Sequence, residues 1–492
     1  MDQRVHDQLK ILQSGIRTDV TLVADFFDVD TPLGEYVKEL HAYEAPAEHR
    51  ERQQLLKRVI QEQLACVFTE DELERAHLDW DEDLKVNIVD HHGFLNHALL
   101  VSTNIIANAH QLPSGAPQGI VVLSDSGVPL NNFFHKRGLK FRGQQLNFIP
   151  HKDRHVVAFA AKKPEQFPLV EAAQRAGMAE DAQTFLAGIA SQLQHLAEHS
   201  HVQSYKDLVQ RVNYTWWKEL FAEELRDRIP DFFYVANEDV AAGMLKEYLQ
   251  DDTHLFSRFL FDPATRDVIV RTFDGVTGCW DLGGTRGSVF FWGVDERGQK
   301  IQLALREDSL VAVDSSVAFE LELTTDSVLA ALREGRVYPT MFLVYGIANF
   351  FCGVRPLVGY GSMNYQTAMR ESWVCALREL GENEEAQLVG RVPTNGFIGG
   401  PLVSFGYDSD SDTLKELYAL DLIERGGLSA DYLQHLRAMP FNLLLQPALP
   451  DIYDSYVRPE HKKEITVTAA DLLGDAFGWV KELEQHRLGS RA

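Results

Sequence analysis

The stretch Lys85–His110, KVNIVDHHGFLNHALLVSTNIIANAH, predicts a β-strand, a polar turn and an α-helix. Val86–Val89 is a short run rich in β-branched side chains, which is typical of a buried strand. Asp90–His97 is polar and contains a glycine, and Ala98–Ala109 has the length and apolar content of a helix. This order is that of a parallel α/β sheet, in which ligands bind beyond the carboxyl ends of the strands. We therefore expect the Asp90–His97 turn, with one aspartate and three histidines, to line a polar site.

A second unit of the same kind follows at a spacing that suits one right-handed crossover. Gly119–Leu123 is the second predicted strand, and it ends in the polar loop Ser124–His135. Phe232–Val235 predicts a third strand, and Asn237 is the expected N-cap of the helix that follows it. Because parallel strands end at the same edge of a sheet, the loops after them should lie together. The sequence therefore predicts an α/β protein with a Rossmann-like parallel sheet at its core.

The rest of the chain divides into regions around this core. We expect a helical N-terminal region (1–84), the first part of the core (85–163), a helical insertion (164–230), the rest of the core with a β-rich segment (231–400) and a C-terminal region (401–492).

Several single elements are also predicted from local patterns. Alternating or continuous apolar residues from about Phe256 to Val313 predict strands, with Asp295–Gly298 as a hairpin turn. His155–Ala160 is a further strand candidate. Thr324–Glu334 predicts a capped helix, and Ala469–His486 predicts an amphipathic helix.

Composition limits the class of protein. The 492 residues are 45% apolar and 24% charged, with a formal net charge of −25, which argues against general affinity for nucleic acid or anionic membrane. The four cysteines show no CxxC spacing, as expected in a reducing compartment. The N-terminal residues lack the apolar core of a signal peptide, and no apolar run reaches membrane-spanning length. We expect a soluble, cytoplasmic protein that acts on a small molecule; its cofactor is unknown, and a homodimer stays open.

The order of the segments resembles the cysteine-adding enzyme family of bacillithiol biosynthesis. NIVDHHGFLNHALL and GIVVLSDSGVPLNNFFH stand where that family has a strand with a GQQ-type turn and a strand ending in Ser-Glu-Asp-His-Asp. TTDSVLAALREG, YPTMFLVYG and VGYGSMNY follow in the order of its later elements, so the likeness covers roughly residues 85–400. His91 and His92 replace the family's paired glutamines. The resemblance implies a cleft for a small polar molecule and a reaction that joins or transfers an amine or thiol such as cysteine.

The histidines of the first turn are the candidate catalytic groups. Imidazole titrates near neutral pH, so His92 or His97 is the expected acid/base, with Asp125 as the orienting carboxylate. One alternative is a metal-dependent hydrolase or oxygenase, in which His91, His92 and His97 bind the metal with a nearby aspartate or His135. Another is a non-catalytic metabolite-binding protein that uses the pocket as a sensor. A further interpretation is that one or two of the histidines only hydrogen-bond the loop backbone.

We expect the substrate in one cleft between Asp90–His97, Ser124–His135 and the glycine-rich turn Gly359–Tyr365. Glycines before a helix allow close backbone approach and leave free N–H groups, although they equally suit tight packing. Arg391 could pair with a carboxylate or phosphate. The predicted substrate-binding residues are His91, Asn96, Ser124, Ser126, Asn131, Asn132, His135, Gly359, Gly361, Asn364, Tyr365 and Arg391.

Overall fold

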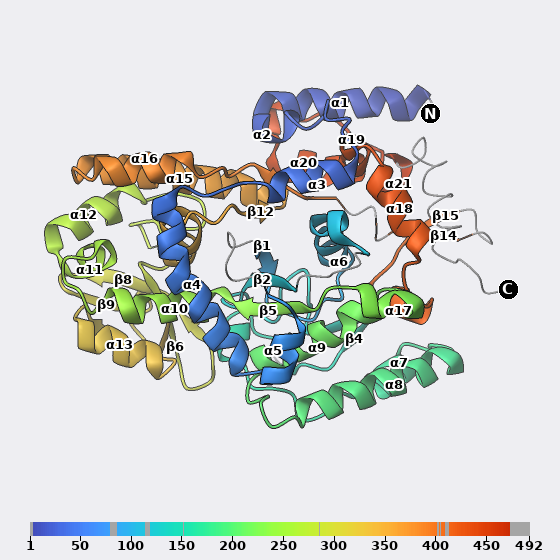
Figure 1. The fold of residues 1–492 in the computed structure, drawn as a ribbon, viewed down its shortest axis with the longest axis horizontal. Helices are drawn as coiled ribbons and strands as arrows, with labels where there is room; N and C mark the ends of the chain where they lie inside the picture. The colour runs from blue at the N-terminus through green and yellow to red at the C-terminus, as the bar shows by residue number, and fades with distance from the viewer. Residues whose placement is uncertain are drawn as a thin grey trace.

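A parallel sheet of three strands lies at the centre of the chain (Figure 1). A computed structural model describes residues 3–78, 86–113, 119–150, 152–284, 286–400, 403, 405–408 and 413–472. The strands are β1 (Val86–His91), β2 (Ile120–Asp125) and β5 (Phe232–Ala236), in the order β1–β2–β5. Val86 pairs with Val121, and Ile88 pairs with Leu123. The prediction that the first two strands are parallel neighbours is therefore confirmed.

The sheet separates two hydrophobic cores. Successive side chains of a strand point to opposite faces, and both faces of this sheet are covered by helices. Ile120 and Val122 belong to one core, together with α6 (Ala98–Ala107) and α9 (Tyr205–Glu219). Val121 and Leu123 belong to the other core, together with α4 (Ala47–Ala65) and α10 (Asn237–Tyr248). Polar side chains are found at the edge of the sheet where the carboxyl ends of the strands lie.

The first region is helical, as predicted. It contains α1 (Gln3–Asp19), α2 (Thr21–Ala24), α3 (Leu33–His41), α4 and α5 (Glu70–Arg75). Helix α5 begins with a capping box between Thr69 and Glu72. Residues 164–230 form α7 (Leu169–Arg175), α8 (Glu180–Ala197), α9 and a 3-10 helix (Glu223–Arg228). The proposed domain boundaries themselves stay predictions.

Two strand predictions are wrong. The segment after Phe256 forms α11 (Leu255–Phe261) and α12 (Pro263–Thr272), because Asp262 caps the backbone N–H of Thr265 and Pro263 occupies the first turn. His155–Ala160 forms two isolated bridges, one of them to Pro129, and then a 3-10 helix. Proline has no N–H to donate, so a ladder cannot extend through that pair.

Short antiparallel sheets follow, and here the predicted β-rich character is confirmed. One sheet joins β6 (Phe291–Val294), β7 (Lys300–Ile301) and β11 (Val337–Pro339), and another joins β8 (Leu303–Arg306), β9 (Ser309–Ala312) and β10 (Glu320–Glu322). The predicted hairpin turn lies between β6 and β7, where the Asp295 side chain accepts from the backbone N–H of Arg297. The predicted helix is α13 (Thr325–Arg333), capped by Thr324.

The remaining elements complete the two cores. They are β3 (Gly138–Phe141), β4 (Gln144–Asn147), α14 (Met341–Tyr345), a π-helix (Gly346–Phe351), β12 (Leu357–Val358), α15 (Tyr360–Glu379), α16 (Asn383–Arg391), β13 (Gly396–Phe397), β14 (Phe405–Asp408), β15 (Thr413–Glu416), α17 (Ala419–Glu424), α18 (Ala430–Ala438), α19 (Phe441–Leu445), α20 (Leu449–Tyr456) and α21 (Ala469–Leu472). The predicted helix Ala469–His486 begins with α21, and its residues after Leu472 lie outside the described residues. Within the described ranges, no helix has both the length and the apolar character needed to span a membrane.

Candidate functional site

The polar side chains that follow β1, β2 and β5 meet at one edge of the sheet. Asp90 is the penultimate residue of β1, and its buried carboxylate accepts hydrogen bonds from the Tyr234 hydroxyl, from Asn104 Nδ2 at 2.6 Å and from the His91 backbone N–H at 2.7 Å. Burial raises the pKa of Asp90 to about 6. Since all of its oxygens are occupied by protein donors, Asp90 holds β1, β5 and α6 together.

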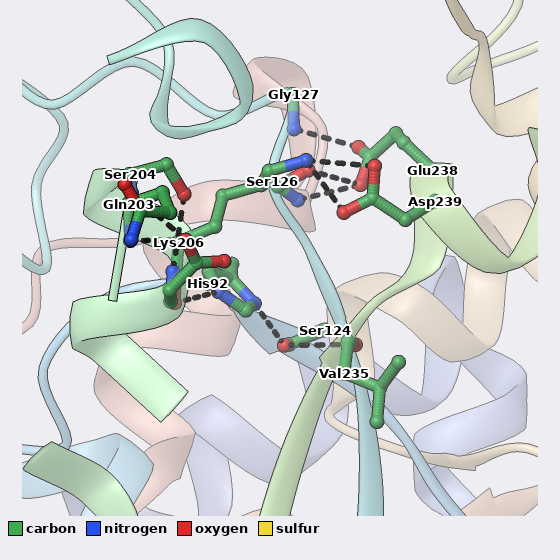
Figure 2. Close-up of polar contacts among 11 residues, drawn as sticks. His92, Ser124, Ser126, Gly127, Gln203, Ser204, Lys206, Val235, Glu238 and Asp239 are labelled. Atoms are coloured by element: carbon green, nitrogen blue, oxygen red, sulfur yellow. Dashed lines mark hydrogen bonds and ion pairs between the residues drawn. The ribbon is translucent and has the colours of Figure 1, made fainter. Parts of the chain in front are cut away.

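His92 is fully buried between β2 and α9 (Figure 2). Its Nδ1 lies 2.8 Å from Ser124 Oγ, and its Nε2 lies 3.1 Å from the Lys206 carbonyl oxygen. A carbonyl oxygen can only accept, so Nε2 carries the hydrogen and Nδ1 accepts from the serine hydroxyl. Burial lowers the pKa of His92 to about 4. A neutral imidazole with both nitrogens bonded to protein has no position left for a substrate proton.

Of the other three histidines, two pack against Phe134 and the third lies near one of them. The ring centroids of His91 and His97 lie 4.7 and 4.9 Å from that of Phe134, and His135 lies 6.2 Å from His91. His97 also caps α6, because its Nδ1 accepts from the Leu99 backbone N–H at 3.1 Å. Burial lowers the pKa of both His91 and His97 to about 4 and that of His135 well below its usual value. These imidazoles are therefore neutral at neutral pH.

A metal centre would require several of these histidine and carboxylate side chains to converge on one point. Among the residues that the structure describes, no group of three His, Cys, Asp or Glu side chains is placed to hold a metal ion. His91, His92 and His97 do not converge, because the ring of His92 is bonded on the α9 side and the other two pack on Phe134.

Asp125 is the last residue of β2 and is half-buried. Its oxygens accept from Asn237 Nδ2 at 2.8 Å and from the Tyr345 hydroxyl at 2.5 Å. The Tyr345 oxygen lies 3.4 Å from that of Tyr365, which donates to Ser362 Oγ at 2.9 Å. Burial raises the pKa of Asp125 above its ordinary value. Asp125 therefore connects the end of β2, through Tyr345, to the first turns of α15.

The helix after β5 contributes two residues to the same edge. Asn237 is not the N-cap that was predicted: the cap is Ala236, and the Asn237 side chain bonds Asp125 instead. Glu238 is buried, and its carboxylate accepts from the Ser126 backbone N–H at 2.8 Å, from Ser126 Oγ at 2.6 Å and from the Gly127 N–H at 2.6 Å. Burial, and then the charge of Asp125, raises the pKa of Glu238 to about 7.

Three predicted asparagines are engaged in loop structure. Asn96 Oδ1 accepts from the Lys140 backbone N–H at 2.8 Å. Asn131 donates to the Lys152 carbonyl at 2.9 Å. Asn132 Oδ1 accepts from the backbone N–H groups of Phe134 and His135 at 2.7 and 3.0 Å, which is the geometry of an Asx turn.

The residues predicted from the C-terminal half lie at two places. Gly359 is the N-cap of α15, and Gly361 and Asn364 follow in its first turns. A Cβ atom on Gly361 would lie 2.5 Å from the Tyr456 hydroxyl, so this glycine permits close packing with α20. Arg391 is the last residue of α16 and is exposed, away from the Asp125 network.

A cleft of about 1050 Å³ is lined by Asp239, the residue after Glu238. Lys206 Nζ lies 2.5 Å from Asp239 on its wall and 4.1 Å from the centre of the Phe159 ring. The backbone N–H of Phe159 donates to the Ser126 carbonyl at 2.8 Å, so the wall is tied to the loop after β2. The charged side chains that line the cleft are Lys152, Lys162, Lys206, Arg297, Arg333, Asp153, Asp207, Asp239, Asp295 and Glu296. A lining with five residues of each charge suits a polar molecule that carries both charges.

Sequence reasoning missed several residues of this edge. Glu238 and Asp239 directly follow a predicted strand, so the rule applied to Asp90 and Asp125 would have found them. Lys206 and Tyr345 come from α9 and α14, and no local signal marks them, because tertiary packing alone brings them to the edge.

No protein-family model matches the chain, and no curated protein matches it at a significant level.

Proposed function

We propose that this chain is an enzyme that joins or transfers a small polar group, such as an amine or a thiol, with Asp125 as its acid/base. The observation that carries the proposal is that Asp125 is a half-buried residue at the end of a parallel strand, and that burial raises the pKa of its carboxyl group. Ligands of parallel α/β sheets bind at this edge. Substrate would approach Asp125 from the charged cleft that Lys206 and Asp239 line, and the cleft would hold its polar groups.

Two further features support this assignment. The three parallel strands with helices on both faces are compatible with a Rossmann-like core, which we propose as the fold. The order of segments resembles the bacillithiol cysteine-adding family, whose reaction is of the proposed kind. In such a reaction the Asp125 carboxylate accepts the proton of the attacking amine or thiol as the new bond forms. It then returns that proton to the leaving group.

The proposed roles differ from those expected for the histidines. His92 is neutral and bonded on both nitrogens, and His97 caps a helix. We propose that they position the loops, whereas Asp125 carries the proton.

The test is turnover of a defined panel of compounds, followed by mass spectrometry. Cysteine, other amino acids and amino sugars are each incubated with activated partners and with the purified protein. General acid–base catalysis contributes about 10²–10⁴-fold, so Asp125→Asn should lower the rate by at least about 100-fold. The control is Asp252→Asn, at an exposed loop position, which should keep the wild-type rate. Saturable binding without turnover by the wild type would instead indicate a metabolite-binding protein.

A further inference from the structure

The Glu238 carboxylate accepts three hydrogen bonds, and its donors come from two consecutive residues. Ser126 supplies its N–H and its hydroxyl, and Gly127 supplies its N–H, at 2.6 to 2.8 Å. A Cβ atom on Gly127 would lie 2.9 Å from Glu238 Oε1 and from the Tyr338 ring, so the glycine makes room for the carboxylate. Figure 2 shows this group between the loop after β2 and the start of α10.

These contacts lie between the proposed acid/base and the cleft. Asp125 directly precedes Ser126, and Asn237, which bonds Asp125, directly precedes Glu238. On the other side, the Ser126 carbonyl accepts from Phe159, whose ring lies under Lys206 on the cleft wall. A change in the hydrogen bonds from Ser126 and Gly127 to Glu238 should therefore affect both Asp125 and the cleft wall.

Protonation of the Glu238 carboxylate would weaken its hydrogen bonds to Ser126 and Gly127, whichever oxygen receives the hydrogen. Oε1 faces one backbone N–H, and Oε2 faces another together with a hydroxyl. The hydroxyl of Ser126 can rotate and accept, but a backbone N–H cannot. One backbone N–H then loses a charged acceptor, and hydrogen bonds to charged groups are about twice as strong as neutral ones.

The surroundings of Glu238 favour proton uptake near neutrality. Asp125 of β2 adds a second negative charge, and it is itself bonded by Tyr345 of α14. Tyr338 of β11 faces Glu238 with a buried hydroxyl that has no hydrogen-bond partner among the described residues. Asp239 is paired with Lys206, so that cation is already engaged. Burial and Asp125 raise the pKa of Glu238 to about 7.

We propose that Glu238 is a positioning residue that, while its carboxylate is charged, holds the loop after β2 in the position from which Ser126 bonds Phe159 of the cleft wall, and that it loosens this hold when protonated. The inference rests on the proposed role of Asp125, which the loop carries. Below neutral pH the loop and the Phe159 wall become less ordered, so the site is assembled only above it.

Hydrogen–deuterium exchange of the unliganded full chain tests this directly. Exchange of peptides that contain Ser126–Gly127 and Phe159 is measured between about pH 6 and pH 8 and divided by the intrinsic rate at each pH. Loss of one charged acceptor should lower protection by about tenfold toward the acidic end. An equal ratio of measured to intrinsic exchange rate at about pH 6 and pH 8 would overturn the proposal.

Two variants and a control separate titration of Glu238 from a purely structural role. Glu238→Gln should abolish the pH dependence, and its persistence would refute the assignment. Ser126→Ala removes one donor to the carboxylate and should move the midpoint to higher pH; an unmoved midpoint contradicts the proposal. Glu247→Gln, at an exposed position of the same helix, should behave as wild type. Because no substrate is used, the result does not depend on whether the turnover test succeeds.

Discussion

Replacing His92 by glutamine should weaken the response of stability to acid. Burial lowers the pKa of His92 to about 4, whereas an unfolded chain binds the proton near the ordinary value of 6.5. Between these two values the unfolded state holds more protons than the folded state, so the free energy of unfolding falls as the pH falls. At about pH 5.5, one unit below the unfolded pKa, His92 alone costs about 1.4 kcal/mol.

The assay is urea unfolding at about pH 7.5 and pH 5.5, followed by fluorescence of the seven tryptophans. Each protein is compared with itself at the two pH values, so the cost of losing the bonds to Ser124 and Lys206 cancels. Wild type should lose about 1.4 kcal/mol more than His92→Gln between the two conditions. His195→Gln, at an exposed position of α8, should lose as much as wild type. Equal losses in wild type and His92→Gln would refute the buried, neutral state of this histidine.

Two further outcomes are expected. Gly93→Ala should lower the free energy of unfolding by about 1–3 kcal/mol, because the added Cβ would lie 2.2 Å from the His135 ring. Gly188→Ala, where nothing lies within 4 Å of the Cβ, should instead raise the free energy of unfolding by about 0.5–1 kcal/mol. If both variants shifted the urea midpoint from that of wild type in the same direction, this packing would be contradicted. Tyr345→Phe removes a donor to the Asp125 carboxylate, so the pKa of Asp125 should rise further. Infrared titration of the protonated carboxyl band measures this pKa, and an unchanged midpoint would show that the hydroxyl does not act on Asp125.

Local patterns were sufficient for the centre of the fold. The apolar runs of β1 and β2, at a spacing of one crossover, predicted parallel neighbours, and the polar residues at their ends marked the edge. The same patterns failed after Phe256, where the apolar residues of α12 read as a strand although Asp262 and Pro263 form a helix start. An N-cap cue outweighs β-branched content in such a case, because the cap satisfies a backbone donor of the first helical turn that would otherwise have no partner within the helix.

The side chains of the edge were less predictable than its position. Asp125 was expected to orient a histidine, but its partners are Asn237 and Tyr345, the latter 220 residues away in sequence. Contacts at that separation depend on how α14 packs against the sheet, which no local pattern encodes. The low pKa of His92 likewise follows from burial among residues of α9 and β2, and not from the sequence around it.

The two hydrophobic cores have a consequence for protein engineering. Val122 and Tyr234 face one core, and Val121 and Phe233 face the other, although all four belong to adjacent strands. A library of variants that changes only every second position of each strand would redesign one core and leave the other with its native side chains. The polar edge would then keep its support from the unchanged helices, so a new core could be selected without rebuilding the site.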